Sequence, residues 1–209
     1  MYLFFDTETT GFPNYSKELN DPAQPHVVQF AMVLCDEKGY EIAAFKTPIK
    51  PEGWTIDESG EAYKVHGISN DLASKYGMSM KPVLYMFRKF QDAAVLKVAH
   101  NYRFDGFILK SLHTRLEVDA GPDIDKYCTM KAMTDIMKMP PTEKMQKAGF
   151  TSFKTPNLSE CYEFCTGKKL EKAHDALADV RAAKDVFFWI MANGHYKEQP
   201  RVKPQGAAA

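Results

Sequence analysis

The chain has 209 residues, 44% of them hydrophobic and 12% aromatic, which is enough for one sizeable core, and no change in composition divides it into two domains. Its 27 basic and 27 acidic side chains cancel, which excludes a broad positive field for long duplexes, so any nucleic-acid partner must be held locally. The four cysteines lack the spacing of a metal site, which excludes a structural zinc centre. No apolar stretch is long enough to span a membrane. We therefore expect a soluble, cytoplasmic protein with no membrane partner.

The first fifty residues predict three strands. Residues 1–5 are an apolar, aromatic run that fits a central strand buried on both faces. Residues 27–36 and 40–49 are rich in β-forming residues and are joined by Glu37-Lys38-Gly39, which predicts a hairpin. Between the first two strands, residues 10–26 are rich in Pro, Asn, Asp and Gly, so we expect a long loop of the kind that often carries function.

Helices and one more strand follow. Apolar spacing predicts helices over residues 81–92, 104–116 and 157–166, and a strand over residues 95–99. Residues 130–139 hold four methionines among charged residues, which we interpret as adaptable core packing rather than a partner site. The last helix begins after an N-cap at Asp175 and ends at Asn193-Gly194. This order predicts a mixed α/β sheet in one domain over residues 1–196, followed by a disordered or vector-derived tail over residues 197–209.

Asp6, Thr7 and Glu8 continue the first strand. Alternate residues of a strand face the same side, so Asp6 and Glu8 project together while Thr7 points away. Two neighbouring carboxylates at the end of a buried strand repel each other unless a cation neutralises them or one stays protonated. Their hard oxygen atoms favour Mg²⁺ or Mn²⁺ over zinc. Taken alone, the tripeptide also fits a solvated, acidic strand end.

Two further polar motifs stand where helices are expected to begin. Residues 101–105 follow the strand at 95–99, and Asp105 alone would be explained as a helix cap. His174 lies in the loop before the last helix and Asp179 lies one turn inside it. A histidine near a helix start is usually only a surface residue. Each motif is therefore ambiguous by itself.

The three motifs together are more specific. The chain carries an acidic pair on strand one, an N-x-x-F-D segment after a later strand and an H-x-x-x-x-D segment at the last helix, in that order. This pattern resembles the DEDD exonuclease superfamily, histidine subclass (DEDDh), and is similar to the proofreading subunit of bacterial DNA polymerase III. The resemblance covers residues 1–191. Further matches are DTETTG at residues 6–11, VHGI at residues 65–68 and the His100-Asn101 pair.

The resemblance implies an RNase H-like fold with a five-stranded mixed sheet flanked by helices. It also implies a metal-dependent 3′-to-5′ exonuclease that releases nucleoside 5′-monophosphates from single-stranded DNA ends. A polymerase in trans is one candidate partner, and the sequence does not decide between proofreading, DNA degradation and RNA maturation. Asp6, Glu8 and Asp179 would bind two divalent ions, Mg²⁺ or Mn²⁺, and Asp105 would hold one of them directly or through water. His174 would be the general base. The chemistry is consistent, because two ions can activate a water and stabilise the leaving oxygen, and histidine exchanges protons readily at working pH.

Recognition of the substrate end is expected from residues near the acid pair. The resemblance implies contacts to the terminal nucleotide, and the predicted substrate-binding residues are Thr7, Thr9, Thr10, Phe12, His66, Asn101 and Phe104. Phe12 could stack on any base, a contact worth about 1–3 kcal/mol, or it could anchor the loop. The loop at residues 10–26 is longer than the matching connection in the proofreading subunits. This difference leaves open both the position of Phe12 against the terminal base and the substrate class.

Two other hypotheses remain. The same fold could trim RNA, and a contact to the 2′-hydroxyl would decide between the two substrates. The chain could instead be a catalytically silent module that binds a polymerase or another protein through its sheet and its methionine-rich helix. The presence of all five expected catalytic residues favours the enzyme. Stabilisation by metal separates the two classes, because only a native metal site gains stability from added ions.

Overall fold

The computed structural model describes residues 1–171 and 173–199, so the predicted tail lies outside the described residues from residue 200 onward. Its centre is a five-stranded mixed sheet in the order β3-β2-β1-β4-β5. β1 is antiparallel to β2, which is antiparallel to β3, while β1 and β4 and then β4 and β5 are parallel. The strands are β1 (Tyr2–Thr9), β2 (Val27–Cys35), β3 (Glu41–Pro48), β4 (Leu96–Ala99) and β5 (Asp125–Cys128). The predicted strands and the central place of the first one are confirmed.

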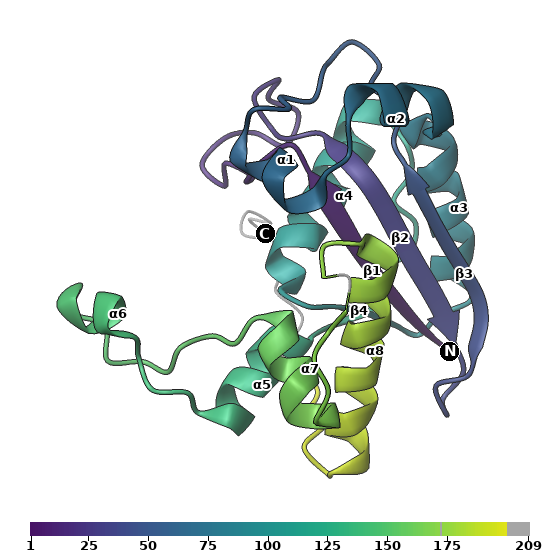
Figure 1. Ribbon diagram of the computed structural model, residues 1–209. Coiled ribbons are helices and arrows are strands. Elements are labelled where there is room, and N and C mark those ends of the chain that lie inside the picture. The colour runs from purple at the N-terminus through teal and green to yellow at the C-terminus, as the bar shows by residue number, and fades with distance from the viewer. Residues whose placement is uncertain (172, 200–209) are drawn as a thin grey trace, which may run out of the picture.

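Helices flank the sheet on both faces (Figure 1). They are α1 (Glu61–His66), α2 (Asn70–Tyr76), α3 (Met80–Asp92), α4 (Tyr102–Leu116), α5 (Thr129–Met137), α6 (Glu143–Lys147), α7 (Leu158–Thr166) and α8 (Ala176–Ala192). The predicted helices are all present with boundaries shifted by one or two residues, whereas α1, α2 and α6 were not predicted individually. None of the helices in residues 1–171 and 173–199 combines the length and the hydrophobicity needed to cross a bilayer.

β1 separates two cores. Leu3 and Phe5 pack on one face of the sheet against apolar side chains of α3 and α4. Phe4 packs on the other face, where its ring lies edge-on to Phe187 of α8, with 5.5 Å between the ring centroids. Because successive strand residues alternate, the acidic residues that follow Phe4 at even positions project toward the α8 face. The strand thus delivers its carboxylates to the side on which the last helix lies.

The start of α8 is fixed to the sheet. All residues of β2 are buried, including Gln29, whose side-chain oxygen accepts a hydrogen bond of 2.9 Å from the backbone N–H of Ala176. Asp175 caps the helix as predicted, accepting from the N–H groups of Leu177 and Ala178, and it forms a 2.7 Å ion pair with Lys46. These contacts hold the first turn of α8 beside the end of β1.

The predicted loop at residues 10–26 contains no helix or strand. Its two ends are joined, because Thr10 N–H donates to the carbonyl of His26 at 2.9 Å and His26 N–H donates to the Thr10 hydroxyl at 3.0 Å. Gln24 is buried inside the loop and bonds the backbone of Asn14 and Glu18. The loop therefore has a defined shape where it leaves β1.

Candidate active site

The acid pair lies at the end of β1. Asp6 and Glu8 are both partly buried and alternate with Thr7, which is buried. Asp6 pairs in register with Ala31 of β2, and the strand remains regular up to Glu8, after which the register shifts. A regular strand at this point means that the two carboxylates project from the same face, as the sequence predicted.

Thr7 connects the strand to Asp105. Asp105 lies in the first turn of α4 with 2% of its surface exposed. Its Oδ1 atom accepts a 3.0 Å hydrogen bond from the Thr7 backbone N–H and a 2.8 Å bond from the Thr7 hydroxyl. Both donors of Thr7 converge on one oxygen of the carboxylate. Thr7 was predicted to contact substrate, and in the structure its donors orient Asp105.

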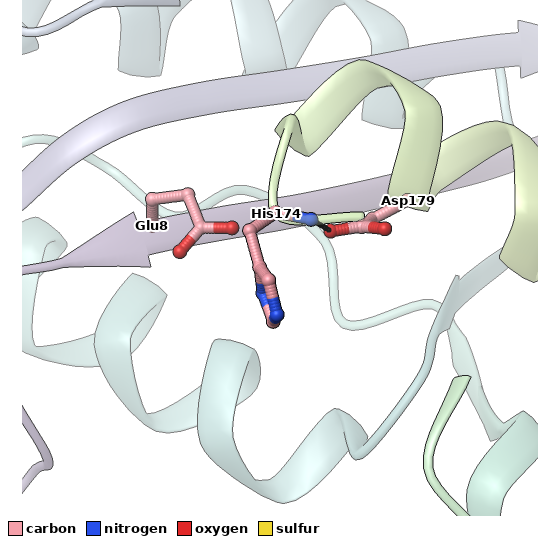
Figure 2. A group of neighbouring side chains, drawn as sticks. All are labelled: Glu8, His174 and Asp179. Atoms are coloured by element: carbon pink, nitrogen blue, oxygen red, sulfur yellow. Dashed lines mark hydrogen bonds between the residues drawn. The ribbon is translucent and has the colours of Figure 1, made fainter. Parts of the chain in front are cut away.

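Residues from the last helix complete the group. Glu8, His174 and Asp179 each offer one ligand atom, and these atoms all lie within 4.8 Å of one another. Figure 2 shows the His174 imidazole extending from its loop near the two carboxylates, with the His174 N–H donating to Asp179 Oδ2 at 2.9 Å. His174 has a φ of 69°, a left-handed conformation uncommon for a residue with a side chain. Asp6 and Asp105 lie outside this closest group.

Burial and mutual repulsion hold protons on these carboxyls. Burial raises the pKa of Asp6 well above its usual range, and Asp105, Glu8 and Asp179 raise it further. The pKa of Glu8 rises to about 7, first through burial and then through Asp179. Burial raises the pKa of Asp105 to about 7 although the Thr7 hydrogen bonds lower it. The pKa of Asp179 rises to about 6 through burial, opposed by the hydrogen bond from His174.

The donor set fits divalent cations. Within the part of the chain that the structure describes, no lysine or arginine lines the cleft around these acids, so no side-chain cation neutralises them. Carboxylate oxygens are the ligands that Mg²⁺ and Mn²⁺ prefer. A bound cation would lower the four raised pKa values, because it stabilises the ionised form of each carboxyl.

The metal-free protein is expected to lose about 1–3 kcal/mol of unfolding free energy between about pH 6.5 and pH 8. A carboxyl with a folded pKa near 7 and an unfolded pKa near 4 binds more protons when folded, so stability falls as the pH rises through the folded value. Burial lowers the pKa of His26 and of His100 to about 4. These two histidines make stability rise with pH, but only below about pH 6.5, which is the pKa of histidine in the unfolded chain.

Urea unfolding in EDTA across this pH range measures the loss. The same titration with millimolar Mn²⁺ is the control, because ions bind the deprotonated carboxylates of the native state and should cancel the fall. A flat profile in EDTA together with no effect of Mn²⁺ would contradict the crowding of these acids.

A cleft of about 630 Å³ surrounds the group. Every predicted site residue lines it: Asp6, Thr7, Glu8, Thr9, Thr10, Phe12, His66, Asn101, Phe104, Asp105, His174 and Asp179. Segments that are far apart in the sequence therefore form one concave surface, which is the usual shape of a small-ligand or substrate site.

The aromatic and amide side chains have distinct positions. Phe12 is 91% exposed and lies edge-on to Phe104, with 6.2 Å between the centroids, so it is not a buried anchor of the loop. Asn101 has a φ of 61° at the start of α4 and makes no capping bond with its side chain. His66 Nδ1 accepts from the N–H of Ile68, and its Nε2 atom has no partner among the described residues.

Two walls of the cleft were missed by the sequence interpretation. α1 contributes Glu61, Ala62 and Val65, and the start of α7 contributes Asn157 and its neighbours. α1 has six residues and none is buried, so no apolar periodicity marked it as a helix. The only available signal was VHGI at residues 65–68, which the resemblance had already singled out.

Comparison with known proteins gives a family and a fold. A family model described as "Exonuclease" (RNase_T) matches residues 3–187, whereas no curated protein sequence matches the chain. E. coli exonuclease I in complex with a dA16 oligonucleotide is similar with a TM-score of 0.68 and 20% identity, over 91% of this chain and 40% of that one. Exonuclease I from Methylocaldum szegediense has a TM-score of 0.66 and 20% identity, over 91% and 40%. The chain spans 40% of those structures, and the likeness confirms the RNase H-like fold.

Proposed function

The chain belongs to the RNase_T exonuclease family, and on that premise we propose that it removes nucleotides one at a time from the 3′ ends of single-stranded DNA and releases nucleoside 5′-monophosphates. The observation that carries the proposal is that one cleft brings together the side chains of Asp6, Glu8, Asp105, Asp179 and His174. This set supports assignment to the histidine subclass of the DEDD exonucleases.

The carboxylates support a site for two Mg²⁺ or Mn²⁺ ions. Asp6, Glu8 and Asp179 would hold them, together with Asp105, which Thr7 orients through its two hydrogen bonds to Oδ1. Such ions supply an activated water and stabilise the leaving 3′ oxygen. Thr7 acts as a positioning residue in this scheme, since its two donors fix the orientation of Asp105.

His174 is proposed as the general base. Its ring is exposed and close to Glu8 and Asp179, so a ring nitrogen can accept the proton of the attacking water and pass it to solvent. The backbone bond from His174 to Asp179 Oδ2 ties the position of the base to that of a metal ligand. The base and the carboxylate therefore keep a constant position relative to each other.

The cleft supports recognition of a strand end. The exposed ring of Phe12 is free to stack on the terminal base, a contact that does not depend on sequence. Thr9, Thr10, Asn101 and His66 provide polar groups around it, and the unpartnered Nε2 of His66 can donate to a phosphate or sugar oxygen. DNA is the preferred substrate of this proposal because the similar exonuclease I structures are described with dA16 and dT13 oligonucleotides.

A time course on 5′-labelled DNA and RNA single strands of matched sequence tests the proposal. We expect a ladder that shortens from the 3′ end in Mg²⁺ or Mn²⁺ and disappears in EDTA, with DNA shortened faster than RNA. The matched control is the same DNA strand with its 3′ end paired in a duplex, since the cleft is expected to act on unpaired ends. Faster RNA cleavage would instead favour the RNA-trimming hypothesis, and no cleavage of either strand would favour the silent interaction module.

A further inference from the structure

Residues 138–156, here called the arm, project from the molecule and contain α6 (Figure 1). The arm is closed at its base, where the Lys154 N–H donates to the Met139 carbonyl at 2.9 Å. α6 buries no residue, and Pro156 is the only buried residue in the whole segment. The arm therefore adds almost nothing to either core of the domain.

The base of the arm is joined to the cleft wall. The Nε2 atom of His100 donates to the Pro156 carbonyl at 3.3 Å, and His100 precedes Asn101, a cleft residue. Lys154 forms an ion pair with Glu160 of α7. Asn157, which follows the arm directly, lines the cleft. The base of the arm therefore lies beside the wall of the cleft.

The arm is positively charged in a chain whose formal net charge is zero. It contains four lysines and a single acidic residue, Glu143. Among the described residues Lys144 forms no ion pair, and Lys147 approaches Glu143 only to 4.0 Å. Both lysines lie on α6 and are exposed. Because the chain as a whole is neutral, a nucleic-acid partner must be attracted by a local group of basic side chains, and the arm provides one.

Two exposed aromatic side chains accompany the lysines. Phe150 is 59% exposed and Phe153 is 46% exposed, and leaving large apolar groups in water is unfavourable. Aromatic rings among lysines match the requirements of a single strand, whose bases stack on rings while its phosphates contact cations. Protein interfaces, by contrast, are depleted in lysine. A nucleic-acid partner fits this surface better than a protein.

We propose that the arm binds the substrate strand on the 5′ side of the terminal nucleotide, with Lys144 and Lys147 at its phosphates and Phe150 and Phe153 against its bases. This inference rests on the proposed function. Phe150 lies seven positions before the cleft residue Asn157, at most ~25 Å of extended chain, so the arm contacts nucleotides a few positions away from the scissile bond. The arm therefore contributes to holding long strands and not to the chemical step.

Binding of a single-stranded DNA oligonucleotide of about 20 nucleotides, measured against salt concentration in an Asp6→Asn background, tests the arm. Lys144→Gln with Lys147→Gln should reduce the slope of log K against log[salt] by about 1.4, since each phosphate contact on a single strand contributes about 0.7. Phe150→Ala with Phe153→Ala should weaken binding by about tenfold or more with the slope unchanged. Lys81→Gln with Lys89→Gln, which removes the same charge from exposed sites on α3, is the matched control and should change neither quantity.

A small substrate separates this inference from the function on which it rests. The p-nitrophenyl ester of thymidine 5′-monophosphate is too short to reach the arm. Both arm variants, made for this assay in the chain that keeps Asp6, should therefore hydrolyse the ester at the unmodified rate. Equal affinity and equal slope for the variants and the unmodified chain would overturn the inference and leave the arm to a protein partner. Loss of ester hydrolysis in the arm variants would overturn it too, since the arm would then act on chemistry. If the unmodified chain cleaves neither the ester nor DNA, the result contradicts the proposed function and not the role of the arm.

Discussion

Asp6→Asn is expected to lower the rate of 3′-terminal nucleotide release by about 10³-fold or more and, at the same time, to stabilise the metal-free protein. Divalent ions contribute several kcal/mol to stabilisation of the transition state, and each 1.36 kcal/mol corresponds to a factor of ten in rate. The stabilisation has a separate origin. Asp6 is the carboxyl whose pKa is raised well above its usual range by burial and by its three acidic neighbours, so a neutral isostere removes that repulsion.

Two measurements check the Asp6 prediction. Single-turnover cleavage of labelled DNA should show the loss of rate, and urea unfolding in EDTA near pH 7.5 should show a gain of about 1–3 kcal/mol. Asp135→Asn, at an exposed carboxylate of α5, is the matched control and should leave both quantities unchanged. Activity close to that of the unmodified chain would end the assignment of Asp6 as a metal ligand.

His174→Asn is expected to slow cleavage by about 10² to 10⁴-fold, the usual contribution of a positioned general base. Asparagine is the appropriate replacement because it tolerates a left-handed backbone better than alanine does, and His174 has a φ of 69°. The backbone N–H that bonds Asp179 is retained in this variant. The substitution therefore removes the imidazole while preserving the carboxylate beside it.

Stabilisation by Mn²⁺ separates a base from a ligand. If His174 is the base, the variant should lose rate but keep the full metal-induced rise in melting temperature. A parallel loss of that rise would make His174 a metal ligand, which its 4.8 Å grouping with Glu8 and Asp179 also allows. His195→Asn, at an exposed histidine outside the cleft, should change neither rate nor stabilisation. An unchanged rate in His174→Asn would remove this residue from the mechanism.

The sheet and the main helices could be predicted because their sequences show their burial. β2 is buried along its whole length and is rich in strand-forming residues, and α8 begins with the side-chain cap that Asp175 forms. α1 and α6 could not be predicted in this way, because neither contains a buried residue. Short helices that pack only on the surface have no apolar stripe to reveal their period.

The residues of the candidate site could be predicted from the sequence, but their contacts and exposure could not. The order of the acidic motifs identified the residues that the cleft brings together. It could not show that both donors of Thr7 converge on one oxygen of Asp105, because this contact joins residues from different elements. It also could not show whether Phe12 is buried, since an aromatic residue in a loop is equally common in either setting. These properties depend on tertiary packing, which local sequence does not encode.

The acids that converge in the cleft come from opposite ends of the domain, and this has a consequence for biosynthesis. Asp6 lies on the first strand and Asp179 on the last helix. At typical translation rates of about 5–20 residues per second, Asp179 is made roughly 10 to 35 s after Asp6, and contacts of such long range form late in folding. A nascent chain cannot assemble the site during that interval. If Asp6 and Asp179 hold the metal ions as proposed, the site becomes competent for hydrolysis only after α8 docks on the sheet.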